Sequence, residues 1–187
     1  MKNLRLLAIL FTTTLFLTSC SSDDDVAPIV EEEVITTLKV TLVGGGNTIM
    51  LEYRDLDPDG PTPPTITVSS PLMANTNYVA SMTLLNELEN PAEDMTIEIE
   101  EEADEHQFFY LTGTGLNISN LTYLDFDGDG KPLGLSFSFD TGDASQGDFT
   151  IILRHEPNKD APGVSEGNIA NAGGDTDISA TFPLVIQ

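Results

Sequence analysis

The chain has 187 residues, of which 31 are acidic and 7 basic, so its formal net charge is −24. This charge excludes nucleic acid as a partner, because a phosphate backbone binds basic surfaces and is repelled by acidic ones. The single cysteine excludes a disulfide within the chain, so the fold must depend on its apolar core or on bound metal. The length suits one domain with a sizeable core.

The first twenty residues predict a bacterial lipoprotein signal peptide. Lys2 and Arg5 make the start positive, an apolar run follows over 6–17, and Cys20 closes the tetrapeptide Leu-Thr-Ser-Cys. The apolar run is too short for a permanent membrane span. The tetrapeptide resembles the lipobox of bacterial lipoproteins, in which the cysteine becomes the acylated N-terminus. We therefore expect cleavage after residue 19 and a lipid anchor at Cys20. The alternative is an ordinary signal peptidase site beside a free thiol.

Residues 21–33 predict an acidic, flexible tether. The sequence Ser-Ser-Asp-Asp-Asp over 21–25 is similar to the export tag that carries Bacteroidota-type lipoproteins across the outer membrane. Cleavage would remove two of the seven basic residues, so the mature charge would be 5 minus 31, or −26. We expect a protein anchored in outer-membrane lipid and facing the cell surface. A solvated tether without an export role is the alternative.

From residue 34 onward, alternating apolar and polar residues predict an all-β domain over 34–187. Short runs rich in Val, Ile, Thr and aromatic residues are separated by Pro, Gly, Asp and Asn. These runs are 34–43, 48–53, 65–69, 78–85, 95–100, 107–111, 116–123, 133–139, 149–154 and 178–186. No stretch after residue 20 shows a sustained helical period. We predict a single immunoglobulin-like β-sandwich of about nine or ten strands.

The sequence also contains an internal duplication. Tyr-Arg-Asp-Leu-Asp-Pro-Asp-Gly over 53–60 recurs as Tyr-Leu-Asp-Phe-Asp-Gly-Asp-Gly over 123–130, at an offset of 70. Further on, Asn-Glu at 86–87 recurs as His-Glu at 155–156, at an offset of 69. We expect a pseudo-repeat of two related units packed in one sandwich.

The two octets are candidate calcium sites. Each has an aspartate at every second position, namely Asp55, Asp57, Asp59 and Asp125, Asp127, Asp129. Oxygen ligands at this spacing, closed by glycine, can wrap a hard cation. Neither octet is an EF-hand, because Ile66 and Ser136 stand where that loop needs a glutamate. The alternative is that both octets are plain turns.

The only two histidines, His106 and His155, lie among carboxylates near predicted strand ends. Imidazole combined with carboxylate suits zinc and other late transition metals. The duplication pairs His155 with Asn86, so we expect the strands that end at Glu87 and Glu156 to reach one end of the sandwich, where the loop over 101–107 could bring His106. The candidate ligands are Glu87, Glu105, His106, His155 and Glu156. The alternative is that His106 lies on the surface and His155 forms a hydrogen bond inside the sandwich.

Catalysis has little support in the sequence. It contains no nucleophile elbow, phosphate-binding loop or zinc-hydrolase helix. It also has no tryptophan and four tyrosines, which is poor material for a sugar-stacking site. We predict that the protein is not an enzyme.

Beyond the lipobox, three segments carry a family resemblance: Glu-His-Gln at 105–107, Arg-His-Glu at 154–156 and Gly-Gly-Asp-Thr-Asp at 173–177. The chain resembles small Bacteroidota-type outer-membrane lipoproteins, often labelled as a type 1 periplasmic binding fold and in some cases encoded beside TonB-dependent receptors. That label denotes two α/β domains, whereas this chain lacks any strand-then-helix alternation. The resemblance implies an accessory role in uptake at the outer membrane.

Two functions follow from these expectations. The first is a non-enzymatic lipoprotein that captures a metal ion, such as calcium or zinc, or a small ligand for a TonB-dependent receptor. The second is a structural or adhesive surface module whose aspartate-rich loops are stiffened by calcium or are plain turns.

Overall fold

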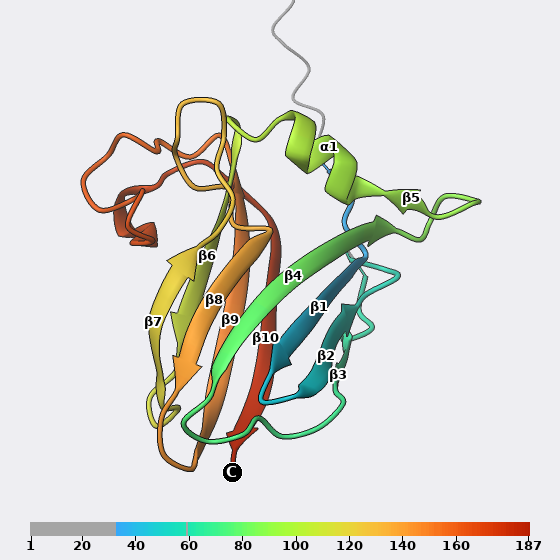
Figure 1. Cartoon of the computed structure of the whole chain (residues 1–187). Helices are drawn as coiled ribbons and strands as arrows, with labels where there is room; N and C mark the ends of the chain where they lie inside the picture. Colours follow the sequence, from blue (N-terminus) through green and yellow to red (C-terminus); the bar gives the residue numbers. More distant parts are fainter. Residues whose placement is uncertain (1–32, 59) are drawn as a thin grey trace, which may run out of the picture. The chain divides into compact units, whose positions relative to one another are not determined.

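Ten strands in two antiparallel sheets make up about half of the described chain, with one α-helix and one short 3-10 helix (Figure 1). The computed structural model describes residues 33–58 and 60–187. The predicted signal peptide, Cys20, the tether up to residue 32 and Asp59 lie outside the described residues. Within the described part, no helix is long and apolar enough to cross a membrane.

The larger sheet has the strand order β3-β2-β1-β4-β8-β7, and β5 pairs with β4. Its strands are β1 (Thr37–Gly44), β2 (Asn47–Arg54), β3 (Thr65–Val68), β4 (Asn77–Asn86), β5 (Glu93–Asp94), β7 (Ile118–Tyr123) and β8 (Ser136–Thr141). The smaller sheet has the order β10-β9-β6, with β6 (His106–Thr112), β9 (Ser145–His155) and β10 (Asp175–Ile186). The 3-10 helix η1 (Ile169–Asn171) lies in the loop between β9 and β10.

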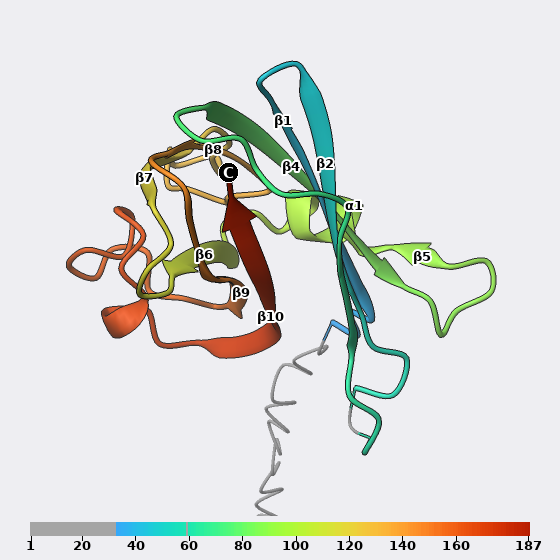
Figure 2. The ribbon, with the colours of Figure 1, turned by 90° about the horizontal axis from the view of Figure 1, so that it is seen from below.

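The core lies between the two sheets, as the turned view in Figure 2 shows. Every second residue of β4 and β10 is buried, which is the pattern of strands with one face against a core. Aromatic rings join the layers. Tyr110 of β6 lies 4.1 Å from Phe137 of β8, and Phe149 of β9 lies 6.0 Å from Phe139 of β8, measured between ring centroids. The predicted all-β sandwich of about ten strands is confirmed.

The prediction of a strand over 95–100 is wrong, because these residues begin the helix α1 (Met95–Glu101). The Asp94 side chain accepts a hydrogen bond from the Thr96 backbone N–H at 3.1 Å and caps the helix. Met95 and Ile99, four residues apart, are buried on one face, whereas Ile97 is 56% exposed. The apolar alternation is therefore only apparent, since the capped turn buries one residue in four.

The predicted duplication is visible in the strand pairing. At offsets of 70 and 69, strands β1 to β4 correspond in order to strands β6 to β9. The antiparallel pair β1–β4 matches β6–β9, and the pair β2–β3 matches β7–β8. The first unit lies wholly in the larger sheet, whereas the second divides its strands between the two sheets.

Candidate metal centre

The two histidines face each other at one end of the smaller sheet. His106 is the first residue of β6, His155 is the last residue of β9, and the two are direct partners in the antiparallel register. Their ring centroids are 4.7 Å apart. This is the end at which β10 begins, opposite the C-terminus (Figure 1). The side chain of His106 is fully buried and that of His155 is 10% exposed.

Two carboxylates complete the cluster. Glu33, just before β1, places Oε1 at 3.0 Å from His106 Nε2 and Oε2 at 2.8 Å from His155 Nδ1. Asp177 of β10 places Oδ2 at 3.9 Å from His106 Nε2 and Oδ1 at 3.9 Å from His155 Nδ1. The side chains of Glu33 and Asp177 are 4% and 7% exposed. We call these four residues, Glu33, His106, His155 and Asp177, the buried cluster.

The hydrogen bonds of His106 determine which of its nitrogens can bind a metal. Nδ1 lies 3.1 Å from the Glu102 carbonyl oxygen, which can only accept, so Nδ1 carries the proton. In the neutral ring, Nε2 then directs a lone pair at Glu33 Oε1, which also carries lone pairs. A proton or a cation must lie between them. A carbonyl that orients the second nitrogen is the usual support of a metal-bound histidine.

The dimensions of the buried cluster fit a small divalent ion. One ligand atom from each side chain lies within 4.8 Å of all the others. Four ligands with bonds of about 2.1 Å to a tetrahedral metal are about 3.4 Å apart. The contacts of 2.8 to 3.9 Å between the histidine nitrogens and the carboxylate oxygens span that value. The four side chains are therefore suited to hold a divalent metal ion.

Burial and like charge perturb the titration of the cluster. Burial, and then the charge of Glu33, raise the pKa of Asp177 to about 7. Asp177 Oδ2 is buried and accepts no hydrogen bond from the described residues. Burial disfavours the His155 imidazolium, but the hydrogen bond and charge of Glu33 outweigh it and raise the pKa of His155. Both shifts favour the protonated forms of these groups, and a bound cation can take the place of those protons.

The duplication shows what the same positions hold without histidine. Offsets of 70 and 69 relate His106 to Thr36 and His155 to Asn86. Thr36 and Asn86 are buried neutral side chains, one position beyond Thr37 and Leu85, the last pair of the β1–β4 register. The Thr36 hydroxyl donates to the Leu85 carbonyl and accepts from the Glu87 N–H. The first unit therefore satisfies these positions with ordinary hydrogen bonds.

The predicted ligands divide into three groups. The two histidines meet in the buried cluster, so the alternative of a surface position for His106 is wrong. Glu105 and Glu156 form a second group, more exposed, that shares His155. Glu87 belongs to neither group. It accepts hydrogen bonds from Arg54 and Thr37, which lower its pKa to about 2.

Glu33 and Asp177 were not predicted as ligands. Glu33 fell inside the predicted tether, and nothing in its local sequence distinguishes it from its acidic neighbours. Asp177 had a signal that could have been used. It directly precedes the last predicted strand, 178–186, and an antiparallel sheet brings the start of that strand beside the end of the preceding strand at His155.

In the first octet, the described carboxylates take part in turns. Asp55 Oδ1 accepts from the Asp57 backbone N–H at 3.1 Å, and Asp57 Oδ2 accepts from the Thr62 N–H at 3.3 Å. Among the described residues, neither carboxylate belongs to a group with metal-binding geometry. Asp59 lies outside the described residues. The turn alternative accounts for the two described aspartates.

The second octet has a different cation nearby, a lysine ammonium. Asp127 Oδ2 lies 2.9 Å from Lys159 Nζ, and both side chains are buried, at 2% and 7% exposed. Asp127 Oδ1 accepts from the backbone N–H groups of Asp129 and Lys131. Burial opposes its ionisation, but these contacts outweigh it and lower the pKa of Asp127. Asp125 Oδ1 accepts from the Gly134 N–H at 2.9 Å.

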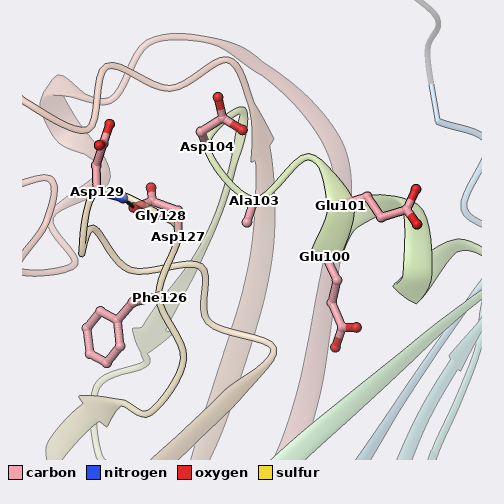
Figure 3. A pocket seen from close by; sticks show the side chains of 8 residues that line it. All are labelled: Glu100, Glu101, Ala103, Asp104, Phe126, Asp127, Gly128 and Asp129. Carbon is pink, nitrogen blue, oxygen red and sulfur yellow. Dashed lines mark hydrogen bonds between the residues drawn. The ribbon is translucent and has the colours of Figure 1, made fainter.

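The second octet also lines an acidic pocket of about 450 Å³ together with the end of α1. In Figure 3, the side chains of Glu100 and Glu101 point away from those of Asp127 and Asp129. Within the described chain, the carboxylates of this pocket do not converge on a common point. The arrangement favours the turn alternative over calcium for this octet as well.

A second pocket, of about 320 Å³, adjoins the buried cluster. Glu33 and Asp177 line it from the cluster side, and Pro58 and Asp175 are among its other residues. It gives solvent one approach to the two carboxylates.

No protein-family model, curated protein or solved structure matches the chain. The resemblance to outer-membrane lipoproteins therefore stays an expectation from the sequence.

Proposed function

We propose that this protein binds a divalent transition metal ion through Glu33, His106, His155 and Asp177, and that the preferred ion is zinc. The observation that carries the proposal is the meeting of His106 Nε2 and Glu33 Oε1 at 3.0 Å while His106 Nδ1 faces a carbonyl oxygen. Two lone pairs directed at each other in a buried site require a cation or a shared proton between them.

The donor set favours zinc and its neighbours in the first transition series over calcium. Zinc accepts imidazole nitrogen together with carboxylate oxygen, as here, whereas calcium takes six to eight oxygens. Four mutually close side chains suit a four-coordinate ion.

The degree of burial supports capture and not catalysis. All four side chains are at most 10% exposed, so an ion bound among them is largely surrounded by protein. We propose a non-enzymatic binding protein, held by a lipid on Cys20 and accessory to uptake through an outer-membrane receptor. The anchor and the receptor are supported by the sequence resemblance alone.

Metal titration of the purified protein tests the proposal. We expect one zinc ion per chain, measured by calorimetry and by elemental analysis. Glu33→Gln should weaken zinc binding more than the roughly 10- to 100-fold loss that follows removal of an outer-shell partner. Glu87→Gln is the matched control, because it removes the same charge from a residue paired with Arg54 outside the cluster. Zinc binding by Glu33→Gln as tight as by the control would refute the proposal.

Zinc affinity is expected to decrease as the pH is lowered. Protons on Asp177, whose pKa is raised to about 7, and on His155, whose pKa is also raised, must leave before both can ligate. The other titratable groups that act on these two are Glu33, His106, Glu105, Glu156, Asp175 and Arg154. Below pH about 7, affinity should fall about tenfold per pH unit for each proton displaced. Calorimetric titrations between pH 8 and 5.5 measure this dependence. A zinc affinity that stays the same across that interval would contradict the prediction.

Cys20→Ala is expected to abolish membrane association without unfolding the domain, because the proposed anchor is a lipid on that cysteine. Cell fractionation measures the first effect and circular dichroism of the recovered protein the second. Recovery of the variant in the membrane fraction would contradict the lipid anchor.

Protease added to intact cells tests orientation, and protection of the protein until lysis would place it in the periplasm.

A further inference from the structure

A second group of metal-binding side chains lies beside the buried cluster and shares His155 with it. One ligand atom each from Glu105, His155 and Glu156 lies within 4.8 Å of the others. Glu105 Oε2 is 3.8 Å from His155 Nε2, the ring nitrogen that faces away from the buried cluster. The Glu105 side chain is 52% exposed, and Glu156 is also exposed. We call these three residues the rim group.

The backbone holds the two glutamates of the rim group together. The Glu156 N–H donates to the Glu105 carbonyl oxygen at 2.6 Å, where the start of β6 meets the end of β9. Each glutamate is directly adjacent in sequence to a histidine of the buried cluster. The exposed and buried groups therefore share the same two strand ends.

His155 itself points to a ligand in the rim group. Its side chain is 10% exposed, and in the described part of the chain Nε2 makes no hydrogen bond, whereas Nδ1 is bonded to Glu33 at 2.8 Å. When Nδ1 donates its proton to Glu33 Oε2, the lone pair of the neutral ring is on Nε2 and faces Glu105. A carboxylate that receives the opposite N–H is the common support of a metal-bound histidine.

We propose that the rim group is a second, exposed site for a divalent cation, from which the ion passes to the buried cluster. This inference rests on the proposed function of that cluster. A neutral imidazole has one lone pair, so His155 ligates at the rim through Nε2 or in the cluster through Nδ1, but not both. In the transfer the ring releases the proton at Nδ1 and takes one up at Nε2, so its charge is unchanged. The chain then holds one ion, and the rim group is a waypoint.

Stopped-flow loading with Co²⁺, followed by its visible absorption, tests the inference. The double variant Glu105→Gln, Glu156→Gln should load about tenfold or more slowly, because the capture site and its local field are lost. Release should slow by a similar factor, so the equilibrium affinity of the buried cluster is little changed. The matched control is Glu100→Gln, Glu101→Gln, which removes two charges from α1 nearby and should load at nearly the wild-type rate.

Equal loading rates in the rim variant and the control would overturn the inference. If Asp175→Asn alone slowed loading, the pocket beside Glu33 and Asp177 would be the route of the ion and the rim group would not. These outcomes leave the proposed function standing, because the wild-type protein still takes up metal. A wild-type protein that binds no Co²⁺ or Zn²⁺ at equilibrium would overturn both proposals. Melting curves of each variant establish that it is folded.

Discussion

Asp177→Asn is expected to raise the melting temperature of the metal-free protein at pH 8 and to remove most of the gain that zinc provides. Burial raises the pKa of Asp177 to about 7, so its stabilising contribution is present below pH about 4 and is lost as the pH rises through 7. The rise in pKa from 3.8 to about 7 corresponds to about 4 kcal/mol, which solvent screening reduces to a cost on the order of 2 kcal/mol at pH 8, or about 4–8 °C in a protein of this size. Asparagine keeps the shape and removes that charge.

In the wild-type protein, zinc at 100 times its dissociation constant should stabilise by about 2.7 kcal/mol, or about 5–10 °C. Differential scanning calorimetry with a chelator and with zinc measures both effects. Asp175→Asn is the control, because it removes the same charge from an exposed position on the same strand. If Asp177→Asn instead lowered the melting temperature of the metal-free protein, Asp177 would be a structural hydrogen-bonding residue and would be removed from the proposed ligand set.

Lys159→Met is expected to destabilise the fold by about 3–5 kcal/mol, because it leaves the buried Asp127 carboxylate without its counter-charge. Lys159 Nζ also donates to the Ala103 carbonyl at 2.6 Å, so the substitution detaches the loop after β9 from the end of α1. Urea denaturation measures the free energy of unfolding.

Lys131→Met is the matched control for this experiment. Its ion pair with Asp160 is exposed, at 34% and 84% for the two side chains, and such pairs contribute about 0–1 kcal/mol. Addition of Asp127→Asn to Lys159→Met should recover part of the loss, because the amide oxygen can still accept from the Asp129 and Lys131 N–H groups. A loss equal to that of Lys131→Met would mean that Lys159 is solvated in solution.

Local patterns predicted the sandwich because alternating burial is a property of short segments. The apolar residues of β4 and β10 are buried at every second position, and their sequence shows it directly. The helix α1 was missed because its sequence alternates as a strand would. The capping contact between Asp94 and Thr96 and the burial of Ile99 against the sandwich determine the helix.

The candidate site could be predicted only in part. The duplication predicted that the strand ending at Glu156 reaches the same end of the sandwich as the strand ending at Glu87, and the loop over 101–107 was expected to bring His106 there. The carboxylates that meet them depend on which strands pair across the sheet and on where the chain enters β1, and no short motif encodes either. For the same reason, nothing in the sequence of the second octet revealed that Lys159, 32 residues beyond Asp127, would be its partner.

Where the first unit has Thr36 and Asn86, the second has histidines. The two units therefore hold their strand ends together by different interactions. In the first unit, the neutral Thr36 hydroxyl joins the start of β1 to the end of β4 with hydrogen bonds that need neither a proton nor a metal ion from solution. In the second, the ends of β6 and β9 meet through groups whose mutual repulsion a cation relieves. Loss of the ion would then loosen only the paired ends of β6 and β9. Amide hydrogen exchange at 106–108 and 153–155 would become faster when the cluster is empty, whereas exchange in β1 and β4 would not change.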